Sequence, residues 1–305
     1  MRPIAKYKEI LKRKGFRYSF HEVWMRIQRF HFIMDNDILY EQWKYIVHKQ
    51  LLKKYRNFNH TYTEDDAKNN PYPDKIWICW FQGEGNAPLI VKKCIASIRK
   101  NAGNKEVIIL TDENIPKYIQ FPDFILKKRA KGKIPRPQFS DLLRVSLLAK
   151  YGGIWIDATV LLTGPIPDYI TEADLFCFKT APLEGRIKMS SWFISAKANN
   201  EILVRTQQLV MQYWKNYNWL KHYFIFHLLF SIAIDSRETL RNQWKKIPYF
   251  NNSIPHTLLL ELHDSYTPER WEQIKNLSPI HKLTYKFKPS DLERKDSFLN
   301  MIMNS

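Results

Sequence analysis

The sequence predicts an α/β fold built on a largely parallel sheet. Apolar runs of strand composition at 75–81 and 105–110 flank a stretch of helical spacing at 89–102. A strand, a loop, a helix and a second strand in this order are typical of parallel sheets covered by helices. Polar residues follow both strands, at 82–86 and 111–114, where ligands bind in such sheets. The chain has 305 residues, 45% of them hydrophobic, which is enough for one sizeable core.

Residues 1–70 differ from the rest, and we expect them to form a basic helical extension to a main domain at 71–305. They are rich in Lys, Arg and aromatic residues, and their apolar residues recur at helical spacing. This region either packs as a helical bundle on the main domain or offers a basic amphipathic surface to anionic lipid. The apolar positions are Val23, Ile27, Phe30, Ile38, Trp43, Ile46, Val47 and Leu51.

The charge and the cysteines limit the partners and the compartment. A formal net charge of +18 favours an anionic partner, which could be a nucleic acid, an anionic membrane or a phosphorylated substrate; a merely soluble basic surface is the alternative. Three cysteines far apart form no disulfide framework and no CxxC metal site, which suits the cytoplasm.

The N-terminus lacks the apolar core of a signal peptide, and the most apolar run, 223–234, is shorter than the about 20 residues that span a bilayer. We therefore expect a soluble or peripheral protein.

The next element along the chain is a helix at 140–151. Ser140 is a plausible N-cap, because its hydroxyl can accept from a free amide of the first turn. Asp141 and Arg144 are three residues apart and so share one helix face. Such a pair is usually a solvated ion pair, but beside a ligand it could bind sugar hydroxyls through Asp141 and phosphate oxygens through Arg144.

Two glycines end this helix, and the apolar run 154–157 is then a third strand with Asp157 at its carboxyl end. A lone Asp after a strand is often a turn residue. At the ligand edge of a parallel sheet, however, it could hold Mg²⁺ or Mn²⁺ and, through the metal, a diphosphate. Beyond residue 165 the pattern predicts strands at 174–178 and 190–197 and helices at 200–217 and 222–236.

The joined block "FSDLLRVSLLAKYGGIWIDATVLLTGP" resembles the capsular polysaccharide synthesis family of bacterial glycosyltransferases. This family is related to the mannosyltransferase-like group with a DxD sugar-binding motif. The segments "IWICWFQG", "IILTDEN", "SSWFISAK" and "IHKLTYK" extend the resemblance to about residues 72–288. It implies a GT-A-like, Rossmann-type mixed sheet flanked by helices, a nucleotide-sugar donor that is usually a UDP-sugar, a divalent metal, and retention of anomeric configuration.

The resemblance also implies roles for individual residues. Asp141 and Arg144 match the pair that contacts donor sugar and diphosphate, Asp157 matches the first Asp of the DxD motif, and Trp80 matches an aromatic that stacks on uracil. An ordinary core tryptophan is the alternative for Trp80. The catalytic candidates are Asp141, Arg144 and Asp157, and the donor-binding candidates are these three with Trp80, Gln82, Asp112, Tyr151 and Lys282.

Thr159 departs from the DxD pattern, because it offers a hydroxyl where the relatives place a metal carboxylate. One hypothesis is that Mn²⁺ or Mg²⁺ still binds, more weakly, to Asp157, Thr159 and His281. The rival is a site in which metal is dispensable and Arg144 and Lys282 carry the phosphate charge.

The predicted function is transfer of a sugar from a nucleotide-sugar to a lipid-linked glycan at the inner face of the cytoplasmic membrane, with the chain bound peripherally. Ser191 and Trp192 are candidates for the acceptor side, and a plain strand is the alternative. A non-catalytic membrane or assembly module with a degenerate DxD site is a second possibility. A nucleic-acid-binding protein is a third, supported only by charge and interleaved aromatics, and we expect no nucleic acid partner.

Overall fold

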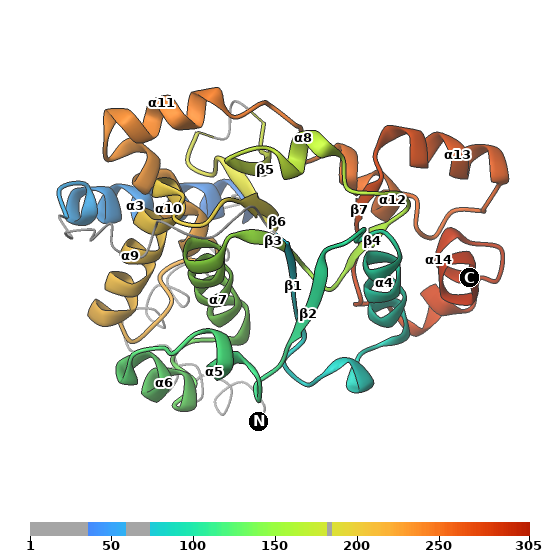
Figure 1. Ribbon diagram of the computed structural model, residues 1–305, viewed down its shortest axis with the longest axis horizontal. Coiled ribbons are helices and arrows are strands. Elements are labelled where there is room, and N and C mark those ends of the chain that lie inside the picture. The colour runs from blue at the N-terminus through green and yellow to red at the C-terminus, as the bar shows by residue number, and fades with distance from the viewer. Residues whose placement is uncertain (1–35, 59–73, 182–184) are drawn as a thin grey trace.

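The computed structural model describes residues 36–58, 74–181 and 185–305. Its centre is a five-stranded sheet in the order β2-β1-β3-β6-β5 (Figure 1). β1 pairs in parallel with β2 and β3, whereas β6 is antiparallel to both β3 and β5. The predicted α/β class, a mixed sheet flanked by helices, is confirmed, but the expectation of a largely parallel sheet holds only for β1, β2 and β3. The sheet strands are β1 (Lys75–Cys79), β2 (Glu106–Leu110), β3 (Gly153–Ile156), β5 (Leu175–Lys179) and β6 (Met189–Ala196).

Helices cover both faces of this sheet. The longer helices are α3 (Asn36–Tyr55), α4 (Leu89–Lys100), α6 (Asp123–Ala130), α7 (Arg136–Tyr151), α9 (Glu201–Asn216), α10 (Ile225–Asp235), α11 (Glu238–Lys246) and α13 (Pro268–Leu277). The shorter elements are η2 (Glu84–Asn86), α5 (Ile115–Tyr118), α8 (Asp168–Thr171), η3 (Ile254–His256), α12 (Thr257–Leu260), η4 (Pro289–Leu292) and α14 (Phe298–Asn304).

Two apolar clusters, one on each face, fix these layers. Successive strand residues point to opposite faces, so Trp77 and Trp155 join the cluster under α7, α9 and α10, while Ile76 and Ile154 join the cluster under α4. Figure 1 shows the first helix group on one side of the sheet and α4, α12, α13 and α14 on the other. The side-chain alternation of a strand therefore decides which residues can reach a ligand above its end.

The described part of the N-terminal region packs on the main domain. α3 contacts α10, and Val47, Leu51 and Tyr55 are buried in the same cluster as α7 and α9. Ile46 remains exposed. The positions Val23, Ile27 and Phe30, predicted to be helical, lie outside the described residues.

A second, two-stranded sheet brings the C-terminal part of the chain to the main sheet. β4 (Val160–Leu162) pairs antiparallel with β7 (Ile280–Lys282), and the register sets Val160 opposite Lys282. The backbone amide of Leu283 also donates to the carbonyl of Thr159 at 2.8 Å. These bonds fix Lys282 beside the loop that follows β3.

The α7 helix begins earlier than predicted. It starts at Arg136 after Pro135, so Ser140 lies inside the helix and is not its N-cap. A proline sets φ for entry into a helix without needing a capping side chain, and the predicted start at residue 140 missed this signal. Among the described residues, none of the helices combines the length and apolar character needed to cross a membrane.

Gly153 is where the turn from α7 into β3 requires glycine. Its φ is +98°, and a Cβ there would lie 2.6 Å from the Lys75 carbonyl oxygen and 2.9 Å from Trp77 Nε1. That indole nitrogen already donates to the Gly152 carbonyl at 2.9 Å, so it cannot move freely.

We therefore expect Gly153→Ala to lower the free energy of unfolding by at least about 2 kcal/mol. Denaturant unfolding followed by circular dichroism measures this. Gly85→Ala is the matched control, because a Cβ at Gly85 meets nothing within 4 Å. Equal midpoints for the two variants would contradict the argument.

Candidate active site

A cavity of about 400 Å³ opens where β1 and β3 end. This is the edge at which α/β sheets bind ligands, and the volume lies in the range of small-molecule sites. Residues from α7, from the loops after β1 and β3, and from β6, α10 and β7 converge on it. The lining includes Trp80, Asp141, Arg144, Trp155, Asp157, Thr159, Ser191, Tyr223, His227, Lys282, Tyr285 and Lys286.

The Asp157 carboxylate is the centre of the polar contacts in this cavity. Its Oδ1 accepts a 2.9 Å hydrogen bond from the Trp155 indole N–H and lies 3.4 Å from an Arg144 nitrogen. Its Oδ2 lies 3.5 Å from the Lys282 ammonium. The backbone amide of Asp157 donates to the Trp192 carbonyl at 2.8 Å, which extends the β3–β6 pairing by one residue and fixes the carboxylate.

Arg144 links α7 to this carboxylate. Its side chain is buried, lies 3.5 Å from Asp141 Oδ1, and donates to the Ser191 carbonyl oxygen. The guanidinium also lies 5.0 Å from the centre of the Trp155 ring. The pair Asp141–Arg144 is thus no solvated surface pair, but part of a buried network that faces the cavity.

Burial disfavours the ionised form of the Asp141 carboxyl. Desolvation raises the pKa of this carboxyl to about 6, the Arg144 guanidinium lowers it, and the nearby Asp157 carboxylate raises it. The carboxyl is therefore ionised at neutral pH at a cost in stability. A perturbed carboxyl in a cleft is a frequent feature of functional sites.

Lys282 reaches the cavity from the second sheet. Its ammonium donates to the Thr159 hydroxyl and lies 3.5 Å from Asp157 Oδ2. The structure therefore brings together Asp157, Thr159 and Lys282, whereas the sequence analysis grouped Asp157 and Thr159 with His281 and gave Lys282 only as a donor-binding residue.

The polar groups around Asp157 do not fit a divalent cation. Both carboxylate oxygens already face cationic side chains, and the Thr159 hydroxyl accepts from Lys282. Within residues 36–58, 74–181 and 185–305, no three His, Cys, Asp or Glu side chains are placed to share a metal ion. Mg²⁺ needs near-octahedral oxygen ligands at about 2.0–2.1 Å, and the positive charges of Lys282 and Arg144 would repel a divalent cation at this place.

His281 is not at the cavity. It precedes Lys282 in β7, so its ring points to the other face of the strand. The ring is buried, and its Nε2 lies 3.1 Å from the Thr163 hydroxyl. The predicted contribution of His281 to a metal site is therefore not supported by its position.

Trp192 is turned away from the cavity by the same alternation. Ser191 lines the cavity, but Trp192 packs in the opposite layer, stacked on Phe178 and donating to the Asn252 amide oxygen at 2.9 Å. Trp192 therefore lies in the core, as the alternative of a plain strand residue expects, and not at the cavity.

Two further donor-binding candidates also lie elsewhere. Tyr151 is at the opposite end of α7, where its hydroxyl donates to the Tyr118 carbonyl at 2.9 Å. Gln82 is exposed on the loop after β1 and is not among the residues that line the cavity.

Trp80 does line the cavity, directly after β1, with its ring edge-on to Tyr285 at 5.3 Å between ring centres. Its indole nitrogen has no hydrogen-bond partner among the described residues. A half-buried tryptophan at a cavity wall can contact a planar ligand. An ordinary core tryptophan, the alternative for Trp80, would not need to line a cavity.

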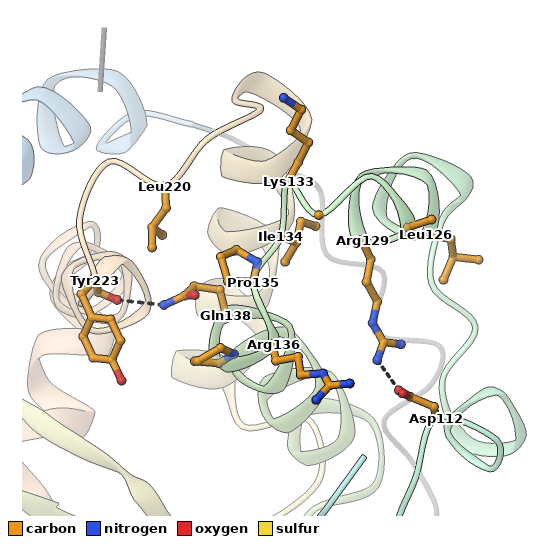
Figure 2. Close-up of a pocket in the computed structure, with 13 residues that line it drawn as sticks. Asp112, Leu126, Arg129, Lys133, Ile134, Pro135, Arg136, Gln138, Leu220 and Tyr223 are labelled. Atoms are coloured by element: carbon orange, nitrogen blue, oxygen red, sulfur yellow. Dashed lines mark hydrogen bonds and ion pairs between the residues drawn. The ribbon is translucent and has the colours of Figure 1, made fainter. Parts of the chain in front are cut away.

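Asp112 belongs to an adjoining cavity of about 820 Å³ (Figure 2). It pairs there with Arg129, while Gln138 donates to the Tyr223 carbonyl at 3.3 Å. Figure 2 shows these two contacts on either side of the segment that leads into α7. Pro137, Gln138 and Tyr223 line both cavities, so the two lie next to each other. The other lining residues of the larger cavity include Leu126, Lys133, Ile134, Pro135, Arg136 and Leu220.

The sequence analysis did not name Trp155, Tyr223 or Tyr285 as site candidates, and all three line the cavity, as does His227. Trp155 could have been found, because it is two residues before Asp157 and a strand places such residues on one face. His227 lies on the buried helix α10, and burial together with Arg144 lowers its pKa to about 3, so its imidazole is neutral. No sequence signal separates Tyr223 and Tyr285 from other surface tyrosines.

Comparison with known proteins identifies relatives of the chain. Residues 28–302 match the family described as capsular polysaccharide synthesis protein, a longer match than the expected 72–288, and one that includes α3. The O-glycosyltransferase braB of Annulohypoxylon truncatum is 26% identical over 156 residues, which cover 46% of this chain and 37% of that protein. The O-glycosyltransferase PaGT of Phomopsis amygdali is 23% identical over 174 residues, which cover 51% of this chain and 41% of that protein. The chain thus matches about two fifths of the length of these relatives.

Among solved structures, the PaToxG glycosyltransferase aligns with 85% of this chain and 95% of its own at 14% identity. The TM-score is 0.40, so this likeness adds nothing to the fold and site described above.

The raised pKa of Asp141 predicts a stability gain on neutralisation. Because the folded state binds this proton more tightly than the unfolded state, ionisation costs stability at neutral pH. We expect Asp141→Asn to raise the free energy of unfolding at pH 7.5 by roughly 1–3 kcal/mol. The gain should shrink as pH falls from about 6 toward 4, the ordinary carboxyl pKa, because the wild-type carboxyl is then protonated in both states. Denaturant unfolding at several pH values measures both effects, and a gain that does not vary with pH would contradict the cause given.

Proposed function

The chain belongs to the capsular polysaccharide synthesis protein family, and from this membership we propose that it is a glycosyltransferase that takes its sugar from a nucleotide-sugar, most simply a UDP-sugar. One observation carries the proposal. Asp141, Arg144, Asp157 and Lys282 converge in one cavity at the ligand-binding edge of the sheet, with Trp80 at its wall. Hydrogen-bond acceptors, cations and a planar surface are what a sugar, a diphosphate and a base require.

The charges in the cavity support an anionic donor. Three cationic side chains, from Arg144, Lys282 and Lys286, face two carboxylates, from Asp141 and Asp157. A diphosphate would add the negative charge that this excess can balance. Asp141 and the neutral imidazole of His227 are then available to accept or donate hydrogen bonds with sugar hydroxyls.

In the proposed step, the bond between sugar C1 and the phosphate oxygen breaks, and its electron pair goes to that oxygen. The acceptor hydroxyl oxygen forms the new bond to C1, and its proton passes to the departing diphosphate. Negative charge therefore grows on the diphosphate. Fixed cations directed at that charge lower the barrier, because the site need not reorganise during the reaction. Retention of anomeric configuration is part of the proposal, and NMR of the product would test it.

The acceptor we propose is a lipid-linked glycan, with the chain held peripherally at an anionic membrane surface. Support comes from the net charge of +18 and from the adjoining cavity. That cavity combines Arg129, Lys133 and Arg136 with apolar side chains of Leu126, Ile134 and Leu220, and contains one acidic residue, Asp112. Cationic and apolar groups side by side suit a ligand with both phosphate and lipid parts.

The first test is release of free nucleotide from a panel of UDP- and GDP-sugars, with no acceptor added. We expect slow hydrolysis of one donor by the wild type. Asp157→Asn should lower the rate at least about 100-fold, because it removes the charge that holds Arg144 and Lys282 in place.

Asp168→Asn is the matched control for this test. Asp168 is exposed in the first turn of α8, and it is not among the residues that line either cavity. Its variant should keep the wild-type rate. If no donor binds or turns over, the non-catalytic assembly module becomes the better interpretation.

A further inference from the structure

We infer that the Lys282 ammonium takes the place of the divalent cation that a DxD site would use. This inference rests on the proposed function and says which group stabilises the departing diphosphate. It starts from the position of the ammonium, which contacts the two residues, Asp157 and Thr159, that occupy the first and third positions of the DxD pattern.

The position of Lys282 is built into the fold. The β4–β7 register sets Lys282 opposite Val160, and the Leu283 amide donates to the Thr159 carbonyl at 2.8 Å. The backbone on either side of the lysine is therefore bonded to the segment that carries Thr159. The side chain is also mostly shielded, with 19% of it exposed. An ammonium held in this way is preorganised, unlike that of a mobile surface lysine.

This arrangement gives a physical reason for a threonine, and not a carboxylate, at position 159. A carboxylate at residue 159 would attract a second cation, whereas a hydroxyl offers the ammonium one neutral acceptor. The ammonium has three donors. One goes to Thr159 and one faces Asp157, which leaves the third for a phosphate oxygen in the cavity.

The charge of a divalent ion is then divided between two side chains. Arg144 lies beside Oδ1 of the Asp157 carboxylate, and Lys282 lies beside Oδ2. Together they supply two positive charges around one carboxylate. When the C1–oxygen bond breaks and the electron pair moves to the phosphate oxygen, this fixed charge stabilises the product without a metal ion.

The first experiment measures donor hydrolysis after exhaustive EDTA treatment, using the nucleotide-sugar that the panel identifies. We expect the wild-type rate to survive EDTA and to be unchanged by added Mn²⁺. Lys282→Met keeps the chain length but removes the charge, and should lower kcat at least about 100-fold. Lys275→Met is the control; Lys275 pairs with Glu272 on α13, does not line the cavity, and its variant should keep the wild-type rate.

The second experiment reads metal binding directly. Mn²⁺ is titrated into the protein with UDP present and followed by electron paramagnetic resonance. We expect the wild type to leave the Mn²⁺–UDP signal unchanged. The double variant Thr159→Asp with Lys282→Ser removes the ammonium and supplies a second carboxylate, so it should bind Mn²⁺ and regain hydrolysis only when Mn²⁺ is present.

The outcomes separate this inference from the proposed function. Wild-type turnover that EDTA abolishes and Mn²⁺ restores would refute the role of Lys282 and leave the transferase standing. Full activity of a folded Lys282→Met variant would do the same. No turnover of any donor, with or without metal, would refute the proposed function itself.

Discussion

The balance of charge around the Asp157 carboxylate is the interaction on which the rest of the site depends. An ionised carboxylate in a partly buried position needs partners, and here Trp155, Arg144 and Lys282 provide them. These partners come from β3, α7 and β7, so one carboxylate ties together the sheet, a helix packed on one face and a strand from the C-terminal part of the chain. Replacing Arg144 or Lys282 by a neutral residue would leave the Asp157 carboxylate with one cationic partner fewer, and the remaining side chains would shift.

Alternation along the strands determines which residues take part. Trp155 and Asp157 share one face of β3 and its extension, and Lys282 faces the cavity while His281 does not. Likewise Ser191 faces the cavity and Trp192 lies in the core. Residues adjacent in sequence therefore lie in different surroundings, because a pleated strand turns neighbouring side chains to opposite sides.

The site also illustrates a conflict between stability and function. Burial raises the pKa of Asp141, and the nearby Arg144 guanidinium offsets this rise only in part. Binding sites often carry such cost, since groups placed for a ligand are poorly placed for the empty protein. The adjoining cavity carries the further cationic side chains of Arg129, Lys133 and Arg136.

The sequence alone predicted the five strands of the main sheet, the helices α4, α7, α9 and α10, and the approach of Asp141, Arg144 and Asp157, because these depend on local periodicity and short spacing. It did not predict β4, α5, α6 or α8. It placed the start of α7 too late, and its site candidates Tyr151, Trp192 and His281, which lie in segments that carry the family resemblance, are away from the cavity. Lys282 was a donor-binding candidate through the family resemblance, but its contacts with Asp157 and Thr159, and the place of Tyr285 at the cavity, are known only from the folded chain. Those contacts depend on the β4–β7 register, which joins segments far apart in sequence and which no local pattern specifies.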